Sequence, residues 1–127
     1  MGKGWLAALC LVTGLAGAAE RHETVPARFI GHWAGSPAAC RDPAADDARL
    51  YIGADRVRFW ESEGPVVAAV TGDPEELLVV AELSGEGQTW LTTAHFRLSA
   101  DGRWLEDVES LPQLPFRRYR CAEPAAR

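Results

Sequence analysis

The side chains best suited to bind metals or transfer protons near neutral pH are the three histidines, His22, His32 and His95. No two of them have metal-ligand spacing and no cysteine pair lies beside them, so a zinc site would have to be assembled from distant strands. His32 lies between Gly31 and Trp33 and is expected on the strand face opposite Trp33. We interpret His32 and His95 as half-exposed strand residues and place His22 in a mobile N-terminal extension. We therefore predict no metal site.

The carboxylates recur without a diagnostic spacing. Asp42, Asp46 and Asp47 could gather round calcium, but their segment lacks the Asp-x-Asp-x-Asp-Gly pattern of a calcium loop. The glycine-rich residues 84–87 lack the Gly-Lys-Ser/Thr ending of a phosphate-binding loop. The sequence therefore predicts no catalytic residue and no cofactor.

Arg56, Arg58 and Trp60 alternate along one predicted strand, so their side chains share a face. Tryptophan and arginine dominate the hot spots of protein interfaces, and these three residues form a candidate recognition patch on the surface. The alternative interpretation is ordinary surface packing, in which the arginine stems cover Trp60.

The chain has 127 residues, a formal net charge of -5 and 47% hydrophobic residues, which indicates one small globular domain. Eleven aromatic residues and scattered glycine and proline exclude a disordered chain or a coiled coil. The acidic balance argues against nucleic acid as a partner, because phosphate binding requires clustered positive charge.

Residues 1–18 have the features of a secretory signal peptide: Lys3, an apolar stretch over residues 5–17, and small residues ahead of a cleavage site before Ala19. The thirteen apolar residues would span about 20 Å as a helix, which is short of the roughly 30 Å hydrocarbon core. Leu9 before Cys10 does not fit a lipoprotein site. We predict a periplasmic or secreted product, residues 19–127, with a net charge of -6 and no membrane span.

The mature chain keeps two cysteines, Cys40 and Cys121, because Cys10 leaves with the signal peptide. An exported chain meets an oxidising compartment, so we predict one disulfide between them. A metal pair or a catalytic thiol would need further partners, and none lies nearby in the sequence.

From residue 28 onward, short segments rich in β-branched and aromatic residues alternate with Gly, Pro, Asp and Ser clusters. Eight strands are predicted, at residues 28–34, 49–53, 56–62, 66–71, 76–83, 89–99, 103–108 and 116–121. The inward row of the sixth strand is expected to run from Trp90 through Ala94 and Phe96 to Leu98. Two prolines make a long helix unfavourable between residues 36 and 48, where we expect an irregular loop with room for one turn after Pro43.

The short turns favour an all-β antiparallel meander. Its apolar face must be buried either by closing into a barrel or by folding into a β-sandwich. With eight strands the first and last run antiparallel and can pair, which removes both edges. We therefore predict a single small barrel over residues 19–127, with a β-sandwich as the alternative.

The segment Phe29-Ile30-Gly31-His32-Trp33 resembles the Gly-x-Trp signature that opens the first strand of lipocalins and related calycins. In that family an arginine late in the last strand packs across the tryptophan and closes one end of the barrel. The resemblance offers Arg118 and Arg120 for this part, and the predicted barrel-end pair is Trp33 with Arg120. Cys40 can reach Cys121 in this register only if residues 35–37 turn the chain back.

The chain also resembles small exported bacterial proteins of unassigned function. Those proteins carry one tryptophan near the start, a second in mid-chain and a basic, aromatic run ending on cysteine. The corresponding residues here are Trp33, Trp90 and residues 118–121.

Two functions follow as hypotheses. The first is a non-catalytic exported barrel that binds a small apolar or amphipathic ligand at its open end, with Ala68, Ala69, Ala81 and Ala94 leaving room inside. The second is a protein-interaction module, such as an inhibitor of a basic envelope or host enzyme like lysozyme, which the charge of -6 favours. Known lysozyme inhibitors are also small exported β-barrels, so this second hypothesis is an analogy of size, charge and compartment.

Overall fold

The structure is a computed structural model, and it describes residues 4, 19–72 and 75–122. The described chain is all β, with nine strands and three single-turn 3-10 helices. The strands are β1 (Glu20–His22), β2 (Gly31–Ala34), β3 (Leu50–Ile52), β4 (Arg56–Arg58), β5 (Glu63–Thr71), β6 (Glu76–Gly85), β7 (Gln88–Leu98), β8 (Trp104–Asp107) and β9 (Arg117–Arg120). The 3-10 turns are η1 (Ala27–Phe29), η2 (Ala38–Arg41) and η3 (Pro43–Ala45). The predicted leader, residues 1–18, lies outside the described residues except for Gly4.

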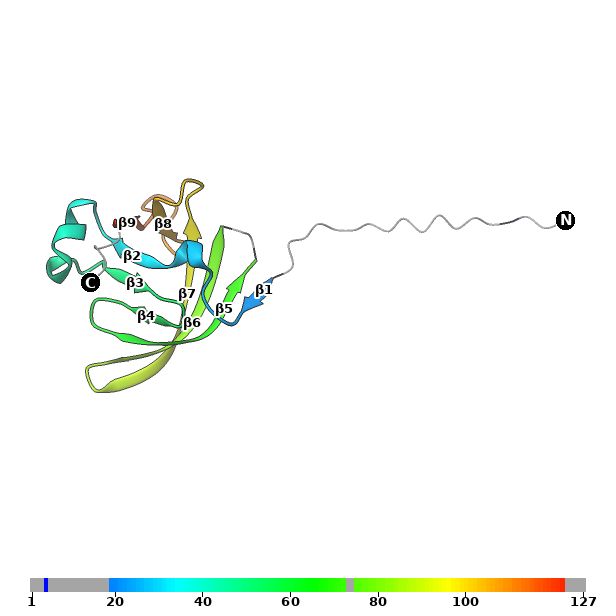
Figure 1. The fold of residues 1–127 in the computed structure, drawn as a ribbon, viewed down its shortest axis with the longest axis horizontal. Helices are drawn as coiled ribbons and strands as arrows, with labels where there is room; N and C mark the ends of the chain where they lie inside the picture. The colour runs from blue at the N-terminus through cyan, green and yellow to red at the C-terminus, as the bar shows by residue number, and fades with distance from the viewer. Residues whose placement is uncertain (1–3, 5–18, 73–74, 123–127) are drawn as a thin grey trace.

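Strands β2 to β9 form a closed eight-stranded antiparallel barrel, as predicted, and not a sandwich. Each strand pairs with the next along the chain, and β9 returns to pair with β2, where Trp33 lies opposite Arg120. This pairing of the first and last barrel strands is the closure seam. Figure 1 shows the long β6–β7 hairpin, green to yellow, running down the barrel wall.

The additional strand β1 lies outside the barrel. It pairs with the second half of β5, from Glu20 opposite Thr71 to His22 opposite Ala69. The His22 ring forms a hydrogen bond with the Thr71 hydroxyl, at 2.7 Å between Nε2 and Oγ1. The expectation of an N-terminal extension at His22 was therefore wrong: the free edge of β5 holds these residues as a strand.

Segment 36–48 also differs from expectation, because it contains two short 3-10 turns. η3 is the turn anticipated after Pro43, whereas η2 was not predicted. The hydroxyl of Ser36 accepts a hydrogen bond from the backbone N–H of Ala39 at 3.1 Å, which fixes the start of η2. A serine before a turn is a common local stabiliser of this kind.

The core fills the barrel from the end that holds η1. Its largest fully buried side chains are Trp33, Phe29, Phe96, Leu50, Leu77 and Leu105. Of the alanines expected inside, Ala69 and Ala81 are buried in this core, and Ala94 packs against it. Ala68 follows an irregularity in the β5–β6 register and pairs with Val80, so it lies on the outer face.

Gly64 is where β5 approaches β6 most closely. A Cβ at this position would lie 1.7 Å from the carbonyl oxygen of Glu82, a distance no side chain can occupy. The absence of a side chain at Gly64 therefore allows β5 to cross β6 where the barrel wall bends.

Candidate functional site

Trp33 and Arg120 lie together inside one end of the barrel. The Arg120 guanidinium carbon is 4.3 Å from the centroid of the Trp33 ring, and Trp33 is fully buried. The guanidinium donates hydrogen bonds to the backbone carbonyls of Arg28, Ile30 and Gly102. These carbonyls belong to the segment before β2 and to the β7–β8 loop, so Arg120 joins both segments and closes this end of the barrel. We call it the closed end.

Gly31 makes room for this arrangement. Its φ is +153°, and a Cβ there would lie 3.1 Å from Nη1 of Arg120. The indole N–H of Trp33 donates to the carbonyl of Phe29 at 3.1 Å, which ties the strand to η1. The glycine and the tryptophan two residues later therefore have linked steric and hydrogen-bonding roles.

Arg118, the other candidate for the contact with Trp33, lies elsewhere in the barrel. It is buried, and its Nε donates to the carbonyl of Ala48 at 2.7 Å while Nη1 lies 3.5 Å from Asp107 Oδ2. Burial lowers the pKa of Arg118, and the charges of Asp107 and Asp46 partly offset that effect. A buried cation needs such partners, so Arg118 is a structural charge.

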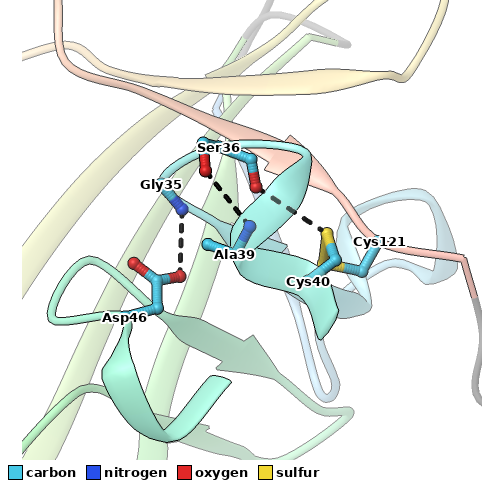
Figure 2. The surroundings of a disulfide bond; sticks show 6 residues. All are labelled: Gly35, Ser36, Ala39, Cys40, Asp46 and Cys121. Carbon is cyan, nitrogen blue, oxygen red and sulfur yellow. Dashed lines mark hydrogen bonds between the residues drawn. A yellow bond between two sulfur atoms is a disulfide. The ribbon is translucent and has the colours of Figure 1, made fainter. Parts of the chain in front are cut away.

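The predicted disulfide is present between Cys40 and Cys121, with the two Cα atoms 5.5 Å apart (Figure 2). Residues 35–41 turn back over β2, which brings Cys40 to the end of β9. Both carboxylate oxygens of Asp46 support this turn by accepting hydrogen bonds from the backbone N–H groups of Gly35 and Ala48. The bond therefore links the segment after β2 to the segment after β9, across the closure seam.

Arg58 and Trp60 line one surface pocket and Arg56 and Arg58 line another, but Arg58 is not the arginine that covers Trp60. Strand β4 ends at Arg58, and Phe59 begins a turn in which its N–H donates to Ser62. The arginine over the Trp60 ring is Arg49, with its guanidinium carbon 4.7 Å from the ring centroid. Arg58 instead covers Tyr51 at 4.5 Å, and Arg56 lies 3.8 Å from Glu63.

His32, Tyr51 and Arg58 form a stack across the outer faces of β2, β3 and β4. The His32 and Tyr51 rings are 4.4 Å apart at an interplanar angle of 15°. Within the described residues Nε2 of His32 is buried with no hydrogen-bond partner. Burial lowers the pKa of His32 below its ordinary value of 6.5, against a smaller opposing effect of Asp46. His32 is therefore held as a neutral ring.

This pKa shift predicts a pH dependence of stability. Below pH 6.5 the unfolded chain takes up a proton at His32 before the folded protein does, so the free energy of unfolding should fall as the pH is lowered towards the depressed folded pKa. A His32→Phe variant keeps a ring on Tyr51 and removes the titration. Urea unfolding at several pH values from 7 to 5 should therefore give a shallower slope for His32→Phe than for the wild type. Equal slopes would contradict the assignment.

The opposite end of the barrel holds a cavity of about 450 Å³, and we call it the open end. There the first half of β7 diverges from β8, because only Phe96, Arg97 and Leu98 pair with that strand. The cavity opens between β7 and the segment that joins β8 to β9, with Phe59 contributed by the turn after β4. Its apolar lining consists of Phe59, Ala94, Phe96 and Phe116.

Polar groups also line this cavity. Asp107 and Glu109 supply two carboxylates, and Thr92 and Ser110 supply hydroxyl groups. Asp107 is anchored by Arg118 on its inner side. An apolar cavity with a few converging polar groups is the usual form of a small-molecule site. Asp107 is already paired with Arg118, so the carboxylate of Glu109 is the group that favours a cation or a hydrogen-bond donor.

The surroundings of the open end expose large apolar side chains. Leu111 and Leu114, on the segment between β8 and β9, are 65% and 75% exposed. Trp90 and Leu91, at the start of β7, are 40% and 67% exposed. Trp90 was expected in the core because its strand face points inward. It remains half-exposed because β8 does not extend that far along β7.

This cavity was not predicted from the sequence. Phe59 and Phe116 were predicted inside strands, but β4 ends before Phe59 and β9 begins after Phe116. Alternation along a strand therefore could not place their rings at one opening. Among the described residues no group of three or more His, Cys, Asp and Glu side chains could hold a metal ion. No helix in the described part of the chain has the length and apolar character needed to cross a bilayer.

Comparisons of the chain with protein families, with characterised proteins and with solved structures found no match.

Proposed function

We propose that this barrel binds a small amphipathic molecule at its open end. The observation that carries the proposal is the cavity of about 450 Å³ between Phe59, Ala94, Phe96 and Phe116. The contact between Trp33 and Arg120 at the other end supports it, since a barrel shut at one end leaves a single entrance. The lipocalin-like Gly-x-Trp segment is in keeping with this arrangement.

The carboxylates at the cavity support a proposal for the head group of the ligand. Asp107 and Glu109 lie on the lining, while the cation of Arg118 is already engaged by Asp107 and by the carbonyl of Ala48. A cationic or hydrogen-bond-donating head would be attracted to this side of the cavity, and an apolar body would contact the three phenylalanine rings. We therefore propose an amphipathic amine as the preferred class.

We further propose that binding takes place outside the cytoplasm. The signal-peptide features of residues 1–18 and the disulfide between Cys40 and Cys121 support this location. A disulfide persists where the surroundings are oxidising, as in the periplasm or outside the cell.

Filling the cavity should weaken ligand binding. Ala94 faces inward and lines the cavity, so the ring of an Ala94→Phe variant should occupy the space of the ligand's apolar body. We expect the affinity for dodecylamine, measured by isothermal titration calorimetry below its micelle concentration, to fall at least tenfold, or about 1.4 kcal/mol.

The matched control is Leu91→Phe, on the same strand but on the outer face, which should bind dodecylamine like the wild type. Thermal unfolding establishes that both variants are folded. Equal binding by wild type and a folded Ala94→Phe variant would rule out the open end as the site. Equal losses in both variants would show that binding does not depend on the cavity.

A further inference from the structure

A second cavity is a groove on the outer surface of the barrel, separate from the open end. It measures about 760 Å³ and lies over β2, β3 and β4, on the face that carries the stack of His32, Tyr51 and Arg58. The Cys40–Cys121 disulfide and Pro43 line one side, and Arg56 and Glu63 line another. We call this cavity the outer groove.

Arg58 is the cation best placed to bind a ligand in the outer groove. Its guanidinium carbon lies 4.5 Å from the centroid of the Tyr51 ring, and Tyr51 also stacks with His32. No acceptor within the described residues takes a hydrogen bond from it. Arginine carries five N–H donors in a planar fork that matches a carboxylate, and stacking reduces the entropy lost when the fork binds.

The charges around Arg58 favour a single negative charge on the ligand. Arg56 also lines the groove and pairs only loosely with Glu63, at 3.8 Å, with both side chains more than half exposed. Two arginines against one glutamate leave a net positive edge on a chain whose overall formal charge is -5. Glu63 lies opposite Arg58 on β5, so these three side chains carry a net charge of +1, which attracts a monoanion and is neutralised by it.

The rest of the outer groove is suited to an apolar chain. Its lining includes Ile30, Pro43, Gly53, Ala122 and the disulfide. A groove with apolar walls and one positive edge complements a molecule that has a carboxylate at one end of a hydrocarbon body.

We propose that the outer groove binds an alkyl carboxylate, with the carboxylate on Arg58 and the chain against the disulfide wall. This site differs in location and in ligand charge from the one proposed at the open end, and it does not depend on that proposal. It also gives the stack of His32, Tyr51 and Arg58 a role as a preformed support for the anion-binding side chain.

Dodecanoate, kept below its micelle concentration, is the probe for this site. Titration into the ¹⁵N-labelled, disulfide-bonded protein should shift the backbone amide signals of Gly31, Tyr51, Gly53 and Arg58. We expect an Arg58→Leu variant to bind at least tenfold more weakly. The affinity of an Arg58→Lys variant should lie between those of the wild type and Arg58→Leu, since lysine keeps the charge but lacks the planar fork.

Arg117→Leu is the matched control. Arg117 also stacks on an outer-face aromatic ring, Trp104, at 4.2 Å, but it is paired with Glu106 and lies outside the groove. The Arg117→Leu variant should bind dodecanoate like the wild type. Because Arg58 is exposed, the thermal midpoint of Arg58→Leu should stay close to that of the wild type. If Arg58→Leu is destabilised, Arg58→Gln provides a second variant.

Three results would overturn the proposal: dodecanoate binding unchanged in Arg58→Leu and Arg58→Gln, an equal loss in Arg117→Leu, or signal shifts confined to Ala94 and Phe96. Dodecylamine binding separates this proposal from the other. Arg58→Leu should retain it, and Ala94→Phe should lose it while still binding dodecanoate.

Discussion

Replacing Cys40 and Cys121 together by serine is expected to lower the free energy of unfolding by about 4 to 5 kcal/mol. The two residues are 81 positions apart, and in the chain-entropy model a loop of this size strongly restricts the unfolded chain. Typical domains have a net stability of about 5 to 15 kcal/mol, so the variant should lie close to its unfolding threshold at 37 °C. Urea unfolding of the oxidised wild type and of the double variant measures the difference.

The wild type reduced with dithiothreitol serves as the control for the serine side chains. It should unfold at the same urea concentration as the double variant, because both lack the covalent link. A variant as stable as the oxidised wild type would mean that the closure seam is held by β2–β9 pairing alone.

Truncating Trp33 should have the second large effect. Trp33 is fully buried at the closed end, and tryptophan-to-alanine substitutions in cores typically cost about 3 to 5 kcal/mol. The change also removes the surface on which the Arg120 guanidinium rests and the donor to the Phe29 carbonyl. Trp33→Phe should cost less, because it keeps an aromatic ring in the core and loses only the indole N–H and part of the ring face.

A double-mutant cycle separates the contact between Trp33 and Arg120 from the loss of burial. With Arg120→Ala as the second variant, we expect a coupling energy of about 1 to 2 kcal/mol, the range for a cation over an aromatic ring that is shielded from water. The more exposed pair of Trp104 and Arg117, at 4.2 Å, should give a smaller coupling. A coupling near zero between Trp33 and Arg120 would contradict a stabilising role for their contact.

The barrel was predictable from sequence because its strands and turns carry two independent signals. Alternation placed Leu50 and Ile52 on one face, and both are buried. Gly and Asp clusters marked the turns, including the two-residue loop Glu86-Gly87 that joins β6 to β7. In a meander of eight strands, the two edge strands run antiparallel and can pair with each other. The observed pairing of β2 with β9 is this arrangement.

Strand β1 was not predictable in the same way. Glu20, Arg21 and His22 contain no apolar residue and show no alternation, so nothing local favours a strand. Their conformation comes from the unpaired edge of β5, which is a tertiary effect. Strands β2 and β4 are shorter than predicted for a related reason. The first predicted residues of β2 form η1, and the residues after Arg58 form the turn at Phe59.

The candidate sites depended on relations across strands that a sequence does not display. The spacing of Arg56, Arg58 and Trp60 indicated one shared face, but the ring of Trp60 is covered by Arg49 from the segment leading into β3. Arg118 and Arg120 lie two residues apart and face the same interior. They nevertheless have different partners, because the register places Arg120 opposite Trp33 on β2 and Arg118 opposite Leu105 on β8, near the partly exposed Asp107.

The continuous ladder of the β6–β7 hairpin bears on the order of folding. Ten consecutive residue pairs join these strands, from Gly85 opposite Gln88 to Glu76 opposite Arg97, all of them close in sequence. Contacts between near neighbours form quickly, whereas the pairing of Trp33 with Arg120 must close nearly the whole barrel into a loop. We therefore expect this hairpin to nucleate folding and the meeting of the first and last barrel strands to be the late, slow event.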